Sequence, residues 1–92
     1  MTKTKKLITL KNGENIPIGT EIVSWNVLGR PNLCEVAGYT VRVTSCLKMP
    51  SLTTLKKWSN NGIAKTPSGK KVEPDGYGPD GSPSWLLITG LI

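Results

Sequence analysis

The chain has 92 residues, 37% of them hydrophobic, and carries a net charge of +6 at neutral pH. This length holds one domain, so we expect residues 1–92 to share one core, and no apolar stretch is long enough to span a membrane. The chain has no histidine, which removes the commonest general base and leaves any zinc site incomplete, so neither catalysis nor metal binding is expected.

The first half of the chain predicts an antiparallel meander of three or four strands. Residues 5–10 (KKLITL) end at Asn12-Gly13, a dipeptide that favours a tight hairpin because both residues tolerate positive φ. Residues 16–25 predict the next strand, which its proline and glycine confine to an edge or a bulge. Residues 35–46 alternate apolar and polar side chains, the period of a half-buried strand.

An amphipathic helix is predicted to begin after Ser51, a good N-cap residue. Leu52, Leu55 and Trp58 recur along one stripe, which we expect to face the core. Gly62 ends the helix in the left-handed conformation. Because the chain has no phenylalanine, its three tryptophans are expected to supply much of the core.

The end of the chain is rich in turns. Residues 64–72 predict a small β-ribbon, and residues 73–81 (EPDGYGPDG) contain two successive turn signals. Ser82 is expected to cap a short last helix with Pro83 at its first position, and Gly90 closes that helix. The predicted class is α+β: a small antiparallel sheet, one amphipathic helix, a turn-rich segment and a short C-terminal helix.

The two cysteines, Cys34 and Cys46, have the spacing of neither a redox pair nor a metal pair. A disulfide between them is geometrically conceivable. No signal peptide precedes them, because residues 1–11 contain only a short apolar run among lysines and threonines. We therefore expect reduced, half-buried thiols in a cytoplasmic protein.

Two segments partly match known ligand-binding motifs, a calcium loop and a phosphate-binding loop, but lack the spacing that those motifs require. Glu73, Asp75 and Asp80 lack the spacing of a calcium loop, and the intervening Pro and Gly residues favour turns. Too many residues separate Gly62 from Gly69 for a phosphate-binding loop, and no Ser or Thr follows the lysine. We expect no enzyme, no cofactor and no small-molecule substrate.

Charge is unevenly distributed along the chain. Residues 1–71 contain all twelve basic residues and three acidic ones, whereas residues 72–92 contain three acidic residues and no basic one. Residues 48–71 contain six lysines and no acid. Such a cluster is typical of a surface for phosphates or an acidic protein partner, and the alternative, a basic surface that only confers solubility, stays open. The acidic C-terminal segment is expected to pack or to face away.

The strongest candidate for a binding surface is residues 51–71, a capped helix followed by a basic turn. The helical period places Lys56 and Lys57 on the solvent side, where an ordinary solvated face is the alternative. Trp58 lies on the apolar stripe, so we expect it in the core and not stacked on a base. The predicted partner-binding residues are Lys48, Thr53, Lys56, Lys57, Asn60, Lys65, Lys70 and Lys71, with Arg30 and Arg42 as additions.

Part of this segment resembles the recognition helix and wing of phage excisionases and related winged-helix proteins. The resemblance lies in Ser51, residues 54–58 (TLKKW), Gly62 and residues 69–71 (GKK). It implies that the helix enters the major groove of duplex DNA through Thr53, Lys56, Lys57 and Asn60, and that Lys70 and Lys71 contact the backbone. That family needs a helix before the recognition helix, where residues 39–46 here predict a strand.

The chain as a whole resembles small accessory proteins of temperate phages: a β-meander and a helix, then VEPDGYGPDGSPSWLLITGLI. In length and pattern it is similar to phage anti-CRISPR proteins that inhibit type I-F surveillance complexes, a class without a shared motif. The resemblance implies a non-catalytic inhibitor in the cytoplasm of an infected bacterial host. Its partner would be the Cascade-like ribonucleoprotein of Cas backbone subunits and crRNA, whose pairing with target DNA it would block. We prefer this hypothesis to the DNA-binding regulator because the strand-rich first half fits it better.

Overall fold

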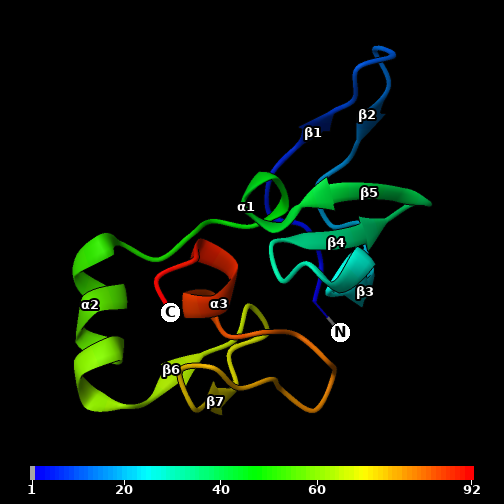
Figure 1. Cartoon of the computed structure of the whole chain (residues 1–92). Coiled ribbons are helices and arrows are strands. Elements are labelled where there is room, and N and C mark those ends of the chain that lie inside the picture. Colours follow the sequence, from blue (N-terminus) through cyan, green and yellow to red (C-terminus); the bar gives the residue numbers. More distant parts are fainter. Residues whose placement is uncertain (1) are drawn as a thin grey trace.

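Among residues 2–92, which the computed structural model describes, the chain forms three separate antiparallel sheets and a few short helices (Figure 1). The molecule measures 41 × 24 × 20 Å along its principal axes. The strand-rich first half lies on one side, and helix α2 (Leu52–Asn61) with the hairpin of β6 (Ala64–Lys65) and β7 (Lys71–Val72) lies on the other. The predicted α+β class and the β-ribbon after the helix are confirmed.

The first sheet is a short hairpin of β1 (Ile8–Thr9) and β2 (Asn15–Ile16), paired antiparallel around the predicted Asn12-Gly13 turn. Gly13 has φ +87°, and its N–H donates to the Leu10 carbonyl at 3.0 Å. A side chain with a Cβ is strained at this φ, which explains why glycine stands here. The hairpin prediction is confirmed.

The segment predicted as one strand over residues 16–25 divides between two sheets, because the chain turns around Thr4 between them. Thr4 is buried, donates its hydroxyl to the Pro17 carbonyl at 3.1 Å and accepts the Thr20 N–H at 3.1 Å. Gly19, at φ +89°, donates its N–H to the Thr4 carbonyl at 2.8 Å. These bonds end β2 and also fix the N-terminal segment in place.

The second sheet is the antiparallel meander β3–β4–β5, formed by Ile22–Trp25, Leu33–Val36 and Tyr39–Arg42. The prediction of one strand over residues 35–46 is wrong at two points. Ala37-Gly38, with φ +52° and +81°, forms a tight turn between β4 and β5. After Arg42 the backbone coils into the one-turn helix α1 (Val43–Cys46), whose end residues are both buried.

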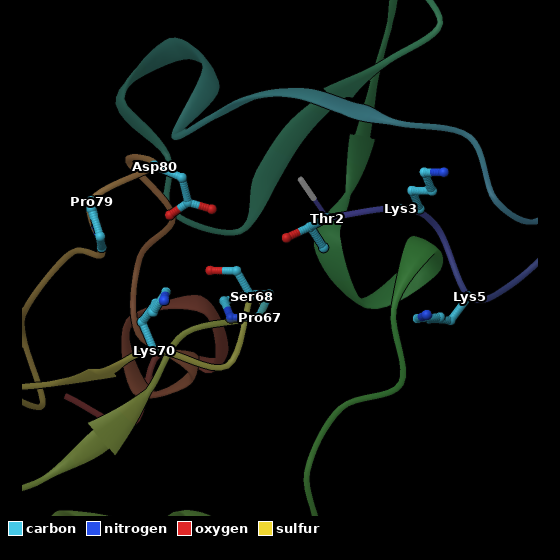
Figure 2. Close-up of a pocket in the computed structure, with 8 residues that line it drawn as sticks. All are labelled: Thr2, Lys3, Lys5, Pro67, Ser68, Lys70, Pro79 and Asp80. Carbon is cyan, nitrogen blue, oxygen red and sulfur yellow. The ribbon is translucent and has the colours of Figure 1, made fainter.

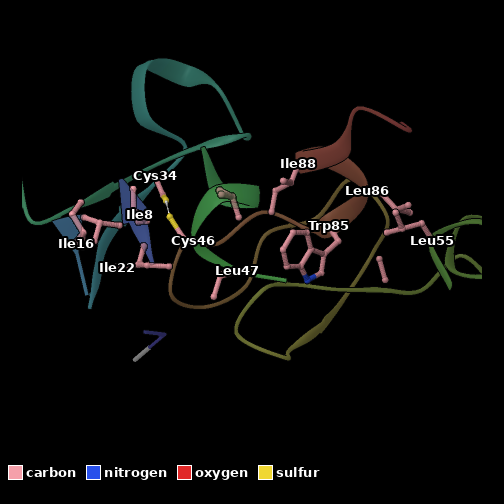
Figure 3. Close-up of a cluster of buried hydrophobic side chains, with 13 residues drawn as sticks. Ile8, Ile16, Ile22, Cys34, Cys46, Leu47, Leu55, Trp85, Leu86 and Ile88 are labelled. Carbon is pink, nitrogen blue, oxygen red and sulfur yellow. Dashed lines mark hydrogen bonds between the residues drawn. The ribbon is translucent and has the colours of Figure 1, made fainter. Parts of the chain in front are cut away.

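Side chains from all parts of the fold form one buried cluster (Figure 3). The prediction that the three tryptophans supply much of the core is wrong, because only Trp85 is buried. Trp25 and Trp58 are partly buried and pack against the buried cluster from outside. Most of the cluster is aliphatic, and its members are Ile8, Ile16, Ile22, Cys34, Val36, Val43, Cys46, Leu47, Leu55, Ala64, Trp85, Leu86 and Ile88.

The boundaries of α2 agree with the prediction. The Ser51 hydroxyl accepts the Thr54 N–H at 3.3 Å, and Gly62 follows the last turn in the left-handed conformation at φ +71°. Only part of the predicted apolar stripe is covered. Leu55 is 1% exposed, but Leu52 is 55% exposed because it lies on the first turn, beyond the packed part of the helix.

The last helix, α3 (Trp85–Thr89), is capped by Ser84 and not by the predicted Ser82. The Ser84 hydroxyl accepts the Leu87 N–H at 3.2 Å and donates to the Pro74 carbonyl. The Ser82 hydroxyl is taken by the preceding turn, where it donates to the Asp80 carboxylate at 2.6 Å. Gly90 closes α3 as predicted, at φ +76°.

Cys34 on β4 and Cys46 on α1 are both free thiols and fully buried, so the prediction that they are half-buried is wrong. Their Sγ atoms lie 3.7 Å apart. Their mutual hydrogen bond, together with burial, raises the pKa of Cys34, and the same bond lowers the pKa of Cys46. Neither thiol reaches solvent, so both serve as packing in the core.

Candidate nucleic-acid interface

The outer face of α2, defined by Thr53, Lys56, Lys57 and Asn60, is exposed along its whole length. At about 100° per residue these four side chains fall within an arc of about 100°, opposite Leu55 and Trp58. Leu55 is buried and Trp58 partly buried where the helix contacts β6 and α3. The structure therefore brings four of the predicted residues together on one surface.

This face carries positive charge without local compensation. Residues 52–61 contain two lysines and no acidic residue. Both lysines are exposed and lie near the middle of the helix, away from the caps that fix its ends. The backbone beneath them is held by Ser51 at the start and Gly62 at the end, so the charges project from a defined scaffold.

The hairpin β6–β7, which follows α2 in the chain, carries two more of the predicted lysines. Lys65 and Lys71 are direct partners in the antiparallel register, and both are exposed. Like charges directly opposite in a sheet destabilise it, so an anion near the pair would relieve their repulsion. Ala64 on β6 is buried in the core cluster, and β6 contacts α2, so the hairpin begins beside that helix.

Lys70 separates from this surface and lines a cavity of about 650 Å³ (Figure 2). The opposite wall of the cavity is the N-terminal segment, which contributes Lys3 and Lys5. We did not predict either lysine as a site residue. Residues 2–6 (TKTKK) show in the sequence as a basic cluster, but only the tertiary fold places Lys3 and Lys5 on the same cavity as Lys70. The cavity is lined by Thr2, Lys3, Lys5, Pro67, Ser68, Lys70, Pro79 and Asp80.

A row of hydroxyl groups holds the hairpin side of this cavity together. Thr66 Oγ1 and Ser68 Oγ lie 2.9 Å apart, and Ser68 Oγ lies 3.2 Å from Ser82 Oγ. The row ends at Asp80 Oδ1, which accepts the hydroxyl and the N–H of Ser82 at 2.6 and 3.2 Å. Thr66 and Ser82 are buried whereas Ser68 and Asp80 are exposed, so these bonds are partly shielded from water.

The environment keeps Asp80 charged. Burial by itself raises the pKa of its carboxyl, but hydrogen bonds from Ser82 and Ser68 outweigh that effect, and the pKa lies below its ordinary value. The acidic C-terminal segment was expected to pack or to face away from the basic surface. Asp80 departs from this expectation, because it faces the same cavity as Lys70.

The remaining predicted residues do not join the face of α2. Lys48 is exposed in the linker between α1 and α2. Arg42, at the end of β5, lines a second, more apolar cavity of about 380 Å³ with Met49 and Leu52. Arg30 follows the 3₁₀ turn η1 (Val27–Gly29), which contacts β4 in the second sheet.

Metal-binding groups and membrane-spanning helices were not expected from the sequence. Within residues 2–92 no group of three or more His, Cys, Asp or Glu side chains is placed to hold a metal ion. In the same part of the chain, no helix has the length and apolar character needed to cross a membrane. Comparison of the chain with protein-family models, curated proteins and solved structures finds no match.

Proposed function

We propose that this protein binds the phosphate backbone of a nucleic acid, free or within a ribonucleoprotein, through the outer face of α2 and without catalysis. The observation that carries the proposal is the grouping of Thr53, Lys56, Lys57 and Asn60 on one exposed arc of a capped helix. Ammonium groups pair with phosphate charge, and hydroxyl and amide groups donate hydrogen bonds to phosphate or base edges.

The hairpin extends this contact. Lys65 and Lys71 are paired on the hairpin that follows α2 in the chain, so a backbone that runs from the helix face to this hairpin would meet four lysines in all. Each phosphate that a lysine neutralises releases a counterion, and log K on duplex DNA then falls with log salt at a slope of about −0.9 per contact. Binding is therefore expected to weaken steeply as salt rises.

The setting that we favour is inhibition of a CRISPR surveillance complex. The protein would be a phage-encoded anti-CRISPR protein in the cytoplasm of an infected bacterial host. It would bind the type I-F crRNA-guided complex along the crRNA and the neighbouring Cas backbone subunits, so that target DNA cannot pair. The resemblance in length and pattern, the strand-rich first half and the basic helix face support this setting.

A second setting, a small excisionase-like regulator that binds duplex DNA, is favoured by one specific observation. The order of α1, α2 and the hairpin β6–β7 is that of a helix, a recognition helix and a wing. A strand through Cys46 would have counted against this order, but residues 43–46 form a helical turn. In this setting α2 would enter the major groove and the hairpin lysines would contact the backbone.

A gel-shift assay distinguishes the two settings. The protein is titrated onto free duplex DNA and onto an assembled type I-F surveillance complex, and target-DNA pairing by that complex is measured in parallel. The inhibitor binds the complex and blocks pairing, whereas the regulator shifts the free duplex. Absence of binding to both, with the protein folded, would refute the proposed function.

A matched pair of charge reversals tests the face itself. K56E/K57E and K6E/K11E each change the net charge from +6 to +2, but only the first pair lies on α2. We expect K56E/K57E to weaken binding strongly and K6E/K11E to keep most of it. Equal loss in both variants would mean that net charge, and not this face, drives binding.

A further inference from the structure

The cavity between the N-terminal segment and the β6–β7 turn has the properties of a ligand site that is separate from the face of α2. Its volume of about 650 Å³ lies within the usual range of small-molecule pockets, and no residue of α2 lines it. We propose that it binds the phosphate of a nucleoside monophosphate or of a terminal nucleotide. This proposal goes beyond backbone binding by α2 and does not depend on it.

The charge of the cavity suits a phosphate monoester. Three lysines and one aspartate line it, a balance of +2. A phosphate monoester carries a charge of about −1.5 to −2 at neutral pH. Figure 2 shows Lys70 and Asp80 directed into the cavity from one side and Lys5 from the other, while the ammonium group of Lys3 points outward. Lys5 and Lys70 are therefore assigned to the phosphate, and Lys3 to a minor role.

The backbone on both sides of the cavity is fixed before any ligand arrives. On the N-terminal side, the Lys5 N–H donates to the Cys46 carbonyl at 2.8 Å, and the Ile22 N–H donates to the Thr2 carbonyl at 3.0 Å. On the hairpin side, the Lys70 N–H donates to Thr66 Oγ1 at 3.3 Å. A ligand between the two sides would have to order only the lysine side chains and not the backbone that carries them, which lowers the entropic cost of binding.

Asp80 explains why a nucleotide is a better ligand than inorganic phosphate. Its carboxylate repels the phosphate, but it accepts a hydrogen bond from a ribose hydroxyl or a base amino group next to that phosphate. Gly78 makes room for this carboxylate, because a Cβ there would lie 3.0 Å from Asp80 Oδ1. The hydroxyls of Thr2 and Ser68, which face the cavity in Figure 2, supply additional donors.

The test is a titration of the isotope-labelled full chain, followed through the backbone amide signals of Ser68 and Asp80. The probes are AMP, inorganic phosphate, and one short oligonucleotide with and without a 5′-phosphate. We expect saturable shifts with AMP and weaker binding of inorganic phosphate. A nucleic-acid end is the natural ligand if the 5′-phosphate adds saturable shifts at Ser68 and Asp80 that the unphosphorylated oligonucleotide does not give, and a free nucleotide is the ligand if AMP shifts these signals and the 5′-phosphate adds nothing. Absence of saturable shifts with every phosphate probe would overturn the proposal.

Variants on both walls guard against an indirect effect. K5A and K70A are each expected to weaken AMP binding by about tenfold, the usual scale of a charge-assisted hydrogen bond, and K3A by less. K11A and K56E/K57E lie outside the cavity and should leave AMP binding unchanged. D80N should tighten inorganic phosphate and remove the preference for AMP. Equal weakening by K11A and K70A, or an unchanged preference in D80N, would contradict the assigned roles.

Discussion

The outer face of α2 and the lysine-lined cavity are both basic, but they arise in different ways. The face comes from one stretch of ten residues, in which the helical period alone decides which side chains share a side. The cavity is lined by Lys5 and Lys70, which are far apart in the sequence. They lie on one cavity because the hydrogen bonds of Thr4 hold the N-terminal segment in place. One basic surface is therefore local and the other depends on the tertiary structure, so different substitutions should disturb them.

The largest effect, on the free energy of unfolding, is expected from a substitution where α2 packs against the core. Leu55 is 1% exposed and joins α2 to the buried cluster. Replacing it by Ala leaves a cavity, and the free energy of unfolding should fall by about 2–5 kcal/mol. Leu52→Ala on the same helix is the control, since Leu52 is 55% exposed, and a change within about 0.5 kcal/mol is expected. Urea unfolding of both variants measures the difference, and equal losses would contradict the packing described for α2.

A smaller effect, confined to the cavity, is expected from Gly78→Ala. The new Cβ would lie 3.0 Å from Asp80 Oδ1 and 3.2 Å from Ser82 Oγ, so these two side chains have to move by a few tenths of an ångström. Crowding of this kind typically costs about 1–3 kcal/mol. The variant should lose AMP binding and keep polyanion binding by α2. Loss of both activities in a folded variant would show that the two surfaces are coupled and do not act separately.

The smallest effect concerns the pH dependence of stability. Asp80 has a folded pKa below its unfolded value of 3.8, so its stabilising contribution is present above that pH and is lost as the pH falls through the folded pKa. D80N removes this contribution. Wild type should therefore lose its stability advantage over D80N as the pH falls below about 4. Melting temperatures of both proteins at neutral and acid pH test this, and a constant difference would exclude it.

The sequence predicted features that depend on neighbouring residues and missed those that depend on distant ones. The Asn12-Gly13 hairpin and the caps of α2 follow from local backbone preferences, and the face of α2 follows from periodicity. The strand predicted through Cys46 fails because residues 43–46 coil to bury Val43 and Cys46, a demand of the core that alternation does not reveal. Ser82 and Ser84 are both good caps, but Ser82 donates its hydroxyl to Asp80 in the preceding turn, whereas Ser84 accepts the Leu87 N–H.

The cavity is the clearest case of this limit. Lys3 and Lys5 are visible as charge near the N-terminus, but nothing local connects them to Lys70 or Asp80. The same holds for Arg30 and Arg42, which were grouped with the helix by charge alone and lie elsewhere in the fold. Charge density identifies a basic protein, and the fold decides which charges act together.

The salt dependence of polyanion binding tests the central claim most directly. Log K for a duplex or for the surveillance complex is measured against log salt for wild type, K56E/K57E and K6E/K11E. If Lys56 and Lys57 each neutralise one phosphate, the K56E/K57E slope on a duplex should be shallower than the wild-type slope by about 1.8, and the K6E/K11E slope should stay close to wild type. Identical slopes for wild type and K56E/K57E would show that the outer face of α2 is not the binding surface.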